Sequence, residues 1–252
     1  TLYNAMTDTQ KITSTSVDDG LSGKVSVVTG GARGIGEAQA KVLANAGSEV
    51  YVVDVLEDEA TDTVKDINST GGNAHFHSLD VTSEDQWKDV ISHIEENSGR
   101  LDVLINNAGI GSEDTVTGET VEVWDQVLDV NLKGTWLGMK HAIPLMKETD
   151  GGSIVNISSV YGKRGAVGGA STAYQATKGG VTLLTKNAAN AHAESVRVNS
   201  IHPGYIETPM TEDADELANV FLRDTPMNRS GAPEEVAKAV YFLASDLSSY
   251  VN

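Results

Sequence analysis

Short apolar segments alternate with longer amphipathic ones along most of this chain. The short segments cover residues 24–28, 49–53, 74–79, 101–105, 153–157 and 196–201, and all except 74–79 contain valine or isoleucine. Apolar runs of this length are typical of strands that are buried on both faces of a parallel sheet. Helical spacing of apolar residues predicts helices over 37–46, 57–68, 120–147, 172–193 and 233–244. A further helix is predicted to begin after a cap at Thr82 or Ser83 and to end near residue 96. The alternation predicts an α/β fold with helices on both faces of a doubly wound parallel sheet.

Two segments lie outside this alternation. Residues 1–20 are polar and rich in threonine, serine and aspartate, so we expect a mobile N-terminal arm. Residues 205–232 are irregular but carry an apolar face, which predicts a lid over a substrate pocket. That face is formed by Met210, Leu217, Val220, Phe221, Leu222 and Met227. The length of residues 21–252 suits a single domain with one core.

The first strand and the first helix are joined by a glycine-rich turn. Gly30, Gly34 and Gly36 lie in it, at a spacing that differs from the commoner GxGxxG dinucleotide motif. Glycines allow backbone N–H groups to approach an anion, and the N-terminus of the following helix adds partial positive charge. The turn therefore predicts a phosphate site, with close packing of strand and helix as the alternative.

Polar residues follow the carboxyl ends of the predicted strands, which is the edge where sheets of this kind bind ligands. They are Asp54, Asp80, Asn107, Ser159 and the pair Pro203–Gly204. Asp54 comes 18 positions after Gly36, where a carboxylate accepts hydrogen bonds from ribose hydroxyls and repels a 2′-phosphate. Asp54 therefore predicts NAD as the cofactor, with capping of the next turn as the alternative role.

Tyr174 and Lys178 are four residues apart on a predicted helix and share one of its faces. A free phenol has a pKa near 10, and a lysine ammonium together with a cationic nicotinamide would lower it. Tyr174 could then exchange the proton of an alcohol while Ser159 holds the substrate oxygen. The alternative is an exposed tyrosine–lysine pair on a helix surface.

The composition of the chain argues against several kinds of binding partner and catalytic site. The 252 residues include 36 acidic and 18 basic side chains, a net charge of −18, which disfavours nucleic acid and anionic membranes. The acidic balance fits either a solvated surface or adaptation to high salt. No cysteine is present, no apolar run approaches roughly 20 residues, and the first 20 residues lack a signal-peptide core. We therefore expect a cytoplasmic protein. The positions of the histidines suggest no metal site. The sequence has no GxSxG motif that would support serine hydrolysis.

Taken together, these motifs resemble the short-chain dehydrogenase/reductase family, in its shorter single-domain branch. The matching stretches lie in family order at residues 29–36, 80–81, 106–109, 130–131, 157–159, 174–178 and 202–204. The resemblance implies a Rossmann-type sheet in the order 3-2-1-4-5-6 and four catalytic residues, Asn131, Ser159, Tyr174 and Lys178. Asn131 would bind a water that links Lys178 to solvent, and Ser159 rather than Ser158 would be the family serine.

The resemblance also implies which residues contact the NAD cofactor. They are Gly30, Arg33, Gly34, Ile35, Gly36, Asp54, Asp80, Val81, Asn107, Gly109, Tyr174, Lys178, Pro203, Gly204, Ile206 and Thr208. Three features depart from the family pattern. Ser159 and Tyr174 are 15 positions apart, a longer gap whose glycines suggest a loop, and the N-terminal arm has no counterpart in the shortest members. The chain as given stops at Asn252, where a seventh strand is expected, so we expect the native polypeptide to continue.

These observations predict an NAD(H)-dependent oxidoreductase that interconverts a secondary alcohol and a ketone, with Tyr174 as general acid/base. A cyclic or aliphatic alcohol is the preferred substrate; a 3-oxoacyl thioester or a hydroxysteroid is the alternative within the family. A non-catalytic NAD-binding sensor would be expected to have lost catalytic residues, yet all four are present. Apolar residues on the helices around Asn131 and Tyr174 also predict a homodimer or homotetramer.

Overall fold

One parallel sheet forms the centre of the fold. The computed structural model describes residues 20–166, 171–211 and 225–252. Within them the strands are β1 (Val25–Thr29), β2 (Glu49–Asp54), β3 (Asn73–Ser78), β4 (Val103–Asn106), β5 (Gly152–Ile157) and β6 (Val196–Ile201). All neighbouring strands are parallel, and they lie side by side in the order β3-β2-β1-β4-β5-β6. The predicted strand order is confirmed.

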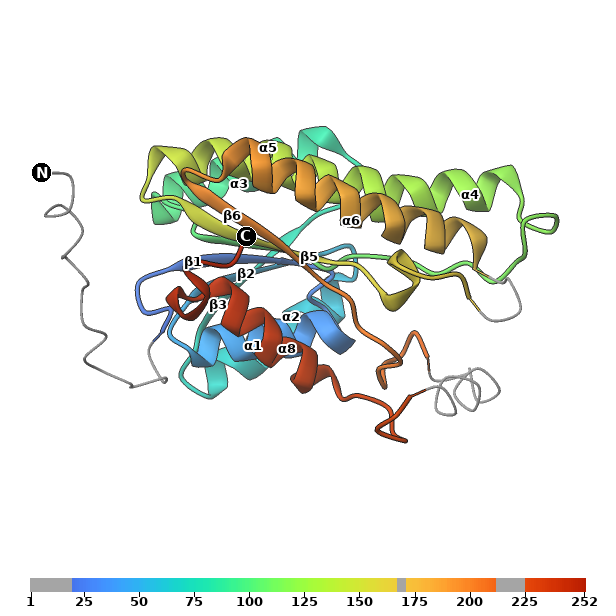
Figure 1. Ribbon diagram of the computed structural model, residues 1–252. Coiled ribbons are helices and arrows are strands. Elements are labelled where there is room, and N and C mark those ends of the chain that lie inside the picture. Colours follow the sequence, from blue (N-terminus) through green and yellow to red (C-terminus); the bar gives the residue numbers. More distant parts are fainter. Residues whose placement is uncertain (1–19, 167–170, 212–224) are drawn as a thin grey trace, which may run out of the picture.

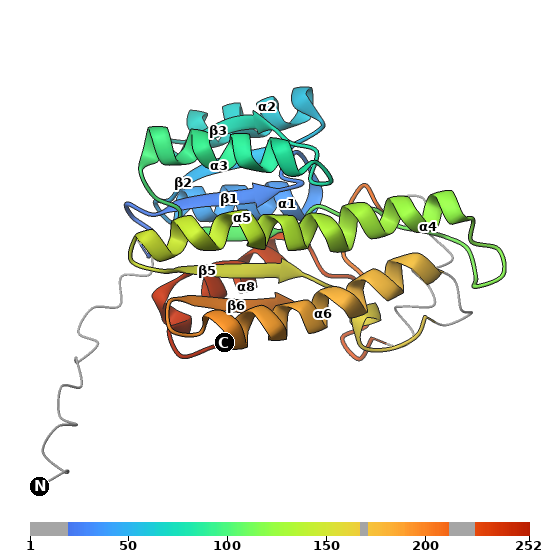
Figure 2. The ribbon, with the colours of Figure 1, turned by 90° about the horizontal axis from the view of Figure 1, so that it is seen from above.

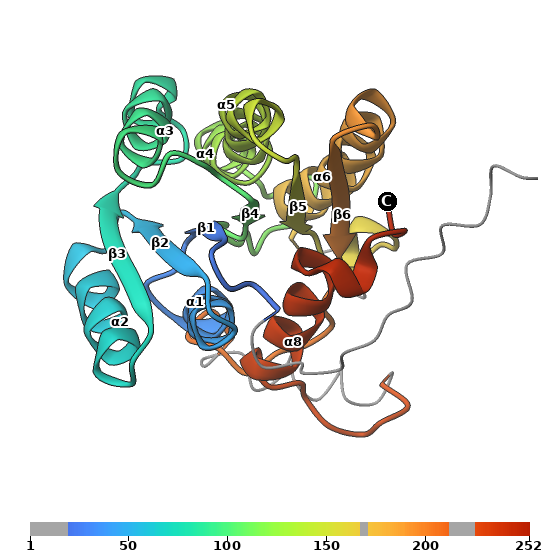
Figure 3. The same ribbon diagram turned by 90° about the vertical axis from the view of Figure 1, so that its left-hand side faces the viewer.

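Helices cover both faces of this sheet. In the described residues they are α1 (Gly34–Asn45), α2 (Glu57–Ser69), α3 (Glu84–Ser98), α4 (Val121–Leu128), α5 (Gly134–Glu148), α6 (Thr172–His192) and α8 (Pro233–Ala244). Figures 1 and 3 show α1, α2 and α8 on one face and α3, α4, α5 and α6 on the other. Seen from above, α4 and α6 extend past the carboxyl ends of the strands (Figure 2). The doubly wound arrangement is confirmed, and Ser83 is the cap of α3.

The helical region expected at 120–147 is interrupted near its middle. Between α4 and α5 the backbone forms a π-helical turn, Asp129–Lys133, that contains the buried Asn131. A π-turn inserts an extra residue into the helical repeat and is frequent at functional sites. The outer limits of this helical region, Val121 and Glu148, lie within one residue of the expected ones. The spacing of apolar residues did not predict the change of helical pitch at Asn131.

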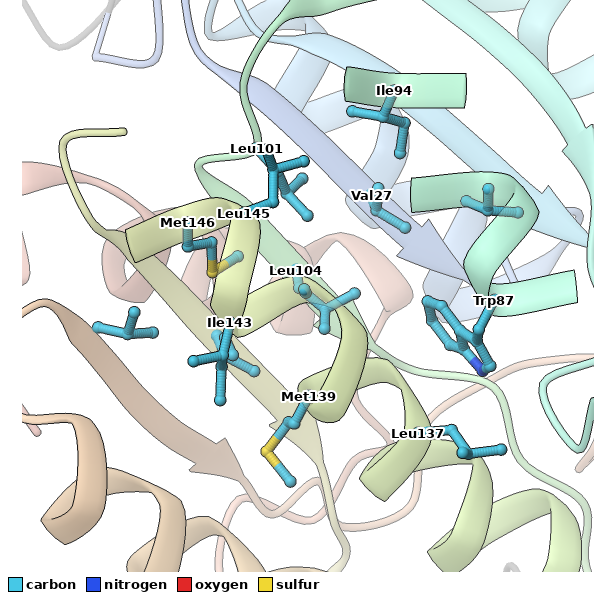
Figure 4. Packing of buried hydrophobic residues seen from close by; sticks show 14 of the residues in the cluster. Val27, Trp87, Ile94, Leu101, Leu104, Leu137, Met139, Ile143, Leu145 and Met146 are labelled. Atoms are coloured by element: carbon cyan, nitrogen blue, oxygen red, sulfur yellow. The ribbon is translucent and has the colours of Figure 1, made fainter. Parts of the chain in front are cut away.

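Apolar side chains fill both interfaces between the sheet and its helices. On the α3/α5/α6 face, Trp87, Leu104, Leu137 and Met146 lie in one cluster of buried residues (Figure 4). The Trp87 indole N–H also donates to the carbonyl of Val81 at 3.1 Å. Buried apolar area of this kind is the main stabilising contribution to folding. Here it also fixes the segment after β3, at the edge of the sheet where ligands bind.

A buried glutamine in α1 has no hydrogen-bond partner. Gln39 is fully buried, and both its Nε2 and its Oε1 lack a partner in the part of the chain that the structure describes. A buried polar group left unpaired costs about 1–3 kcal/mol. We therefore expect Gln39→Met to raise the free energy of unfolding by about 1 kcal/mol, measured by urea unfolding at equal protein concentration. Gln39→Glu, which buries a charge, should lower it; a loss of stability in Gln39→Met would contradict the assignment.

The structure describes only part of the two segments that fall outside the alternation. Residues 1–19 of the expected arm and 212–224 of the expected lid, with Leu217, Val220, Phe221 and Leu222, lie outside the described residues. The flanks of the lid segment are joined, because the Glu207 N–H donates to the Gly231 carbonyl at 3.0 Å and the Gly231 N–H donates to the Tyr205 carbonyl at 2.9 Å. Of the described apolar residues of this segment, Met210 and Met227 are exposed, and Met210 lines the cavity described below.

Strand β6 is the last strand in the sheet order and is hydrogen-bonded to the last residues of the chain. The Val198 backbone N–H donates to Oδ1 of Asn252 at 2.8 Å, and the side-chain amide of Asn199 donates to the carbonyl of Val251 at 2.9 Å. The outer side of β6 therefore has polar partners within the described residues. Among the described helices, none combines the length and the apolar content needed to cross a membrane.

Candidate active site

A cavity of about 550 Å³ lies at the carboxyl edge of the sheet. Residues that follow all six strands line it, including every residue that the family resemblance assigns to the cofactor. Of the four candidate catalytic residues, Ser159, Tyr174 and Lys178 line the same cavity, whereas Asn131 lies behind its wall. The polar residues predicted to meet at this edge are thus brought together by the parallel strands.

The glycine turn forms one end of this cavity. Gly30 and Gly34 adopt positive φ angles of 63° and 61°, a backbone conformation that residues with a Cβ rarely adopt. A Cβ atom on Gly36 would overlap the carbonyl oxygen of Gly30, so this glycine serves close packing. The two roles considered for the turn therefore coexist: Gly36 permits the packing, while the N-terminus of α1 at Gly34 and Ile35 faces the cavity. Such an opening fits the pyrophosphate of a dinucleotide.

Asn107 and Thr29 fix the geometry of that turn. The Asn107 side-chain amide donates to the carbonyls of Thr29 and Gly30 at 3.0 and 3.1 Å. The Thr29 hydroxyl accepts from the backbone N–H groups of Asn107 and Ala108 at 2.9 and 3.0 Å. Asn107 lines the cavity, but its side chain is occupied in tying β4 to the turn. Thr29 was not among the candidates, although its place directly before the glycines could have suggested this role.

Asp54 lies at the end of β2 and is 9% exposed. Its Oδ2 accepts the Ala32 N–H at 3.0 Å and its Oδ1 accepts the Leu56 N–H at 3.1 Å. Asp54 thus caps the next turn, as the alternative role proposed, and also faces the cavity. A carboxylate oxygen has two lone pairs, so both oxygens retain acceptor capacity for a pair of ribose hydroxyls.

Asp80 and Val81 form the cavity wall beyond β3. The Asp80 carboxylate accepts the Thr82 N–H at 2.9 Å, and its own N–H donates to the side chain of Gln86 at 2.7 Å. Val81 packs against Gly134 at the start of α5, where a Cβ atom would lie 2.8 Å from a Val81 methyl group. The family resemblance implies that Asp80 and Val81 contact the adenine end of the cofactor, and both line the cavity.

Ser159 and Tyr174 are hydrogen-bonded to each other through their side chains. The neighbouring Ser158 points elsewhere, because its hydroxyl bonds the Lys178 carbonyl at 2.9 Å and the Thr182 hydroxyl at 3.0 Å. Of the two serines, Ser159 is therefore the one beside the phenol, in agreement with the choice made from the family pattern. His202 supports this segment, since its Nδ1 lies 3.0 Å from the Ser159 carbonyl oxygen.

Lys178 is buried beside Tyr174, which rules out the exposed tyrosine–lysine pair considered as the alternative. The lysine is 4% exposed, its Nζ donates to the Ile157 carbonyl at 2.7 Å, and Nζ lies 5.5 Å from the centre of the Tyr174 ring. Burial lowers the pKa of Lys178 to about 8, since desolvation disfavours the ammonium. A lysine with that pKa can both hold and release a proton near neutral pH.

The expected lowering of the Tyr174 pKa is not produced by the protein groups. Burial raises the pKa of this phenol above 10, the Ser159 hydrogen bond lowers it in part, and Tyr161 raises it further. The sequence argument weighed the lysine charge but not the desolvation of the ring, and desolvation is the larger effect. A lowered pKa at Tyr174 therefore needs positive charge from a bound ligand.

Asn131 holds the segment that follows β4. Its Oδ1 accepts the Ile110 N–H at 2.8 Å, and its Nδ2 donates to the Ile110 carbonyl at 2.9 Å and to Thr177 at 3.2 Å. A Cβ atom on Gly109 would lie 3.2 Å from Asn131 Oδ1 and 3.4 Å from Lys178 Nζ. Gly109 thus keeps open the space between Asn131 and Lys178, which is where the family's bridging water is expected.

The sequence reasoning missed residues in the loop between β4 and α4. Ser112 and Glu119 accept hydrogen bonds from the first turn of α6, at the N–H groups of Tyr174 and Ala173. No periodicity marks this loop, so only knowledge of which elements meet could have identified them. Over the part of the chain that the structure describes, no group of three or more His, Asp or Glu side chains is arranged to hold a metal ion.

The chain is similar to known oxidoreductases over most of its length. A family model described as enoyl-(acyl carrier protein) reductase matches residues 30–252. Cyclopentanol dehydrogenase of Comamonas sp. (strain NCIMB 9872) is 43% identical over 92% of this chain and 94% of its own length. The 3-oxoacyl-[acyl-carrier-protein] reductase of Thermotoga maritima is 42% identical over the same shares. The solved structure of levodione reductase superposes with a TM-score of 0.87 at 34% identity, covering 92% of this chain and 94% of that one.

Proposed function

The chain belongs to the short-chain dehydrogenase/reductase family of NAD(P)-dependent oxidoreductases, and on this premise we propose that it interconverts a secondary alcohol and a ketone with NAD(H). The observation that carries the proposal is the arrangement of Ser159, Tyr174 and Lys178 on the wall of one cavity. A serine hydroxyl, a phenol and a buried lysine that line the same cavity as a glycine turn could move a proton beside a bound dinucleotide.

Each of these residues has a defined part in the proposed reaction. The nicotinamide, when bound, supplies or accepts the hydride. Ser159 donates a hydrogen bond to the substrate oxygen and keeps it beside Tyr174, whose hydroxyl gives or takes the proton of the alcohol. Lys178, whose pKa burial lowers to about 8, can restore the proton of Tyr174. Asn131 and Gly109 leave room for the water that would connect Lys178 to solvent.

The proposed substrate is an alicyclic secondary alcohol or its ketone. Apolar side chains line part of the cavity, among them Ile110, Ile206 and Met210. They offer no charged group that would recognise a phosphate or a carboxylate. The relatives support the choice, since one is named for cyclopentanol and a structural neighbour for levodione. Burial of a small ring against these side chains would be favourable by about 25 cal/mol for each Å² of apolar surface.

A second candidate is the reduction of a 3-oxoacyl thioester. The 42% identity to the Thermotoga maritima reductase favours it. Against it stands the net charge of −18, since a thioester carried on an acidic protein would be repelled. A non-catalytic NAD-binding sensor remains the rival from outside catalysis, and the presence of all four catalytic residues argues against it.

A substrate screen that follows the absorbance of NADH tests this proposal. We expect oxidation of cyclopentanol and cyclohexanol with NAD, and reduction of the matching ketones with NADH. The same screen should include a 3-oxoacyl thioester and a hydroxysteroid, each of which would replace the alicyclic assignment if it were turned over much faster. Binding of NADH with no turnover of any alcohol or ketone would instead favour the sensor.

The face formed by α4, α5 and α6 supports the proposal of a dimer. Four of the apolar residues on these helices are buried in the core instead, namely Val127, Leu137, Met139 and Val181. Trp136 and Leu183 remain 44% and 68% exposed. In the proposed dimer a second copy of the chain would cover these two side chains.

We expect light scattering at micromolar protein to report at least a dimer, and Leu183→Glu to shift it toward the monomer. The matched control is Ser69→Glu, which adds the same charge at the end of α2, on the other side of the sheet. A wild-type monomer would contradict the proposal.

A further inference from the structure

Helix α6, which carries Tyr174, begins without a local cap. The residue before it, Ser171, has a φ of +65°, in the left-handed region, and its side chain makes no capping hydrogen bond. The first N–H groups of any α-helix have no partner within the helix. Tyr174 is the third residue of α6, so the position of this phenol depends on how those N–H groups are held.

The loop between β4 and α4 supplies the missing cap from a distant part of the chain. The Thr172 N–H donates to the Asp114 carbonyl at 3.2 Å, the Ala173 N–H to Glu119 Oε2 at 3.0 Å and the Tyr174 N–H to Ser112 Oγ at 3.3 Å. Three successive N–H groups at the start of α6 are thus satisfied by one loop. Two of the three acceptors are side chains, which a substitution can remove without altering the backbone.

The same loop is anchored at the wall of the cavity. Ser112 is buried and comes two residues after Ile110, which lines the cavity and is held on both backbone groups by Asn131. From the other side, the Thr177 hydroxyl joins the side chain of Asn131 to the Tyr174 carbonyl, at 3.2 and 2.7 Å. The start of α6 is therefore connected to the cavity wall through the loop and through Asn131.

We propose that Ser112 and Glu119 are positioning residues that hold the first turn of α6, so that the Tyr174 hydroxyl stays within hydrogen-bond reach of Ser159. This inference rests on the proposed role of Tyr174 as general acid/base. A displacement of about 1 Å at a reacting group can reduce the rate on the order of 10²-fold. A loosened first turn would move Tyr174 by a fraction of that distance, so we expect a loss of about tenfold.

The test compares variants that remove an acceptor with variants that keep it. Ser112→Ala and Glu119→Ala remove the acceptor, whereas Ser112→Thr and Glu119→Gln retain an oxygen at the same place. Glu113→Ala is the control, because Glu113 is an exposed carboxylate on the same loop. In Ser112→Ala and Glu119→Ala, the removing variants, we expect kcat to fall about tenfold and the KM for NADH to stay unchanged. In Ser112→Thr and Glu119→Gln, which keep the acceptor, we expect kcat to return toward the wild-type value. Hydrogen exchange of the first turn of α6 should rise in the removing variants only.

A purely structural cap would give faster exchange but an unchanged kcat, and that result would overturn the proposal. Unchanged exchange in the removing variants would overturn it as well. Titration of the Tyr174 phenol gives a readout that needs no turnover, taken as the absorbance difference between each variant and the same variant with Tyr174→Phe. Because the Ser159 hydrogen bond lowers the pKa of Tyr174, its loss should raise that pKa in the removing variants. If the wild-type protein turned over no substrate, the proposed function would fail, while exchange and titration would still decide the positioning role.

Discussion

Replacement of Tyr174 by phenylalanine should reduce kcat on the order of 10²–10⁴-fold, the usual loss when a general acid/base is removed. The substitution keeps the ring, its packing and its distance to Lys178, and deletes only the hydroxyl that Ser159 bonds. Binding of NADH should survive, because the glycine turn and Asp54 are untouched. The loss should therefore appear in kcat and not in the dissociation constant of the cofactor.

Tyr161 provides a matched control for this experiment. It lies close enough to raise the pKa of Tyr174, and burial raises its own pKa, so the two phenols share an environment. Tyr161→Phe deletes the same atom nearby and should leave most of the activity. Steady-state kinetics with saturating cofactor and fluorescence titration of NADH separate the two effects. If Tyr174→Phe kept a large share of wild-type turnover, Tyr174 would not be the proton donor.

The sequence predicted the fold well because most of the strands are short apolar runs; β3, with the sequence NAHFHS, is the exception. The runs at 49–53 and 196–201 match β2 and β6 to within one residue, and the helix expected at 233–244 coincides with α8. Buried parallel strands need such runs, and the segments between them are long enough only for crossover helices. The order of the strands followed from the family resemblance and not from the pattern.

The grouping of candidate residues was predictable for the same reason, since each follows a strand and parallel strands end at one edge. What the pattern could not supply was the distribution of hydrogen bonds at that edge. Asn107 is occupied with the glycine turn, and Asp54 bonds two backbone N–H groups while facing the cavity. These pairings join residues that are far apart in sequence, and no periodic signal encodes them.

Burial also altered the electrostatics in a way that the sequence did not reveal. Lys178 was expected mainly as a positive charge next to Tyr174, but it is buried, its pKa falls to about 8, and the pKa of Tyr174 rises. Spacing on a helix places two side chains on one face but does not say how much water reaches them. The direction of both shifts depends on desolvation, which only the packing of α6 against the sheet determines.

The geometry at Asp54 leads to the second large expected effect: we expect the protein to prefer NAD over NADP. Its carboxylate is almost fully buried and faces the cavity where the 2′-phosphate of NADP would lie. That phosphate adds close to two negative charges, and their repulsion from a partly desolvated carboxylate costs a few kcal/mol, on the order of 10²–10³-fold in preference. Glu57 and Asp58 follow in the first turn of α2 and add further negative charge.

Arg33 is the basic residue that could oppose this preference. It lines the cavity at the N-cap of α1 and is exposed, and among the ion pairs of the described residues none joins it to Asp54. An exposed guanidinium is screened by water and can lie against the adenine of either cofactor, so it discriminates less than the buried carboxylate does.

Asp54→Ser should therefore shift the preference toward NADP(H), and Asp54→Asn should weaken the preference for NAD while keeping the shape of the side chain. Asp54 accepts hydrogen bonds from the N–H groups of Ala32 and Leu56 on its two oxygens, and Asp54→Asn keeps only one of these acceptors, so thermal unfolding has to confirm that both variants are folded. Glu57→Gln, which removes a neighbouring exposed charge, is the control and should change the preference little, since an exposed charge is largely screened. The measurement is kcat/KM with each cofactor in the wild type and the three variants. Equal values for NAD and NADP in the wild type, or an advantage for NADP, would mean that Asp54 does not read the ribose and that Arg33 governs the choice instead.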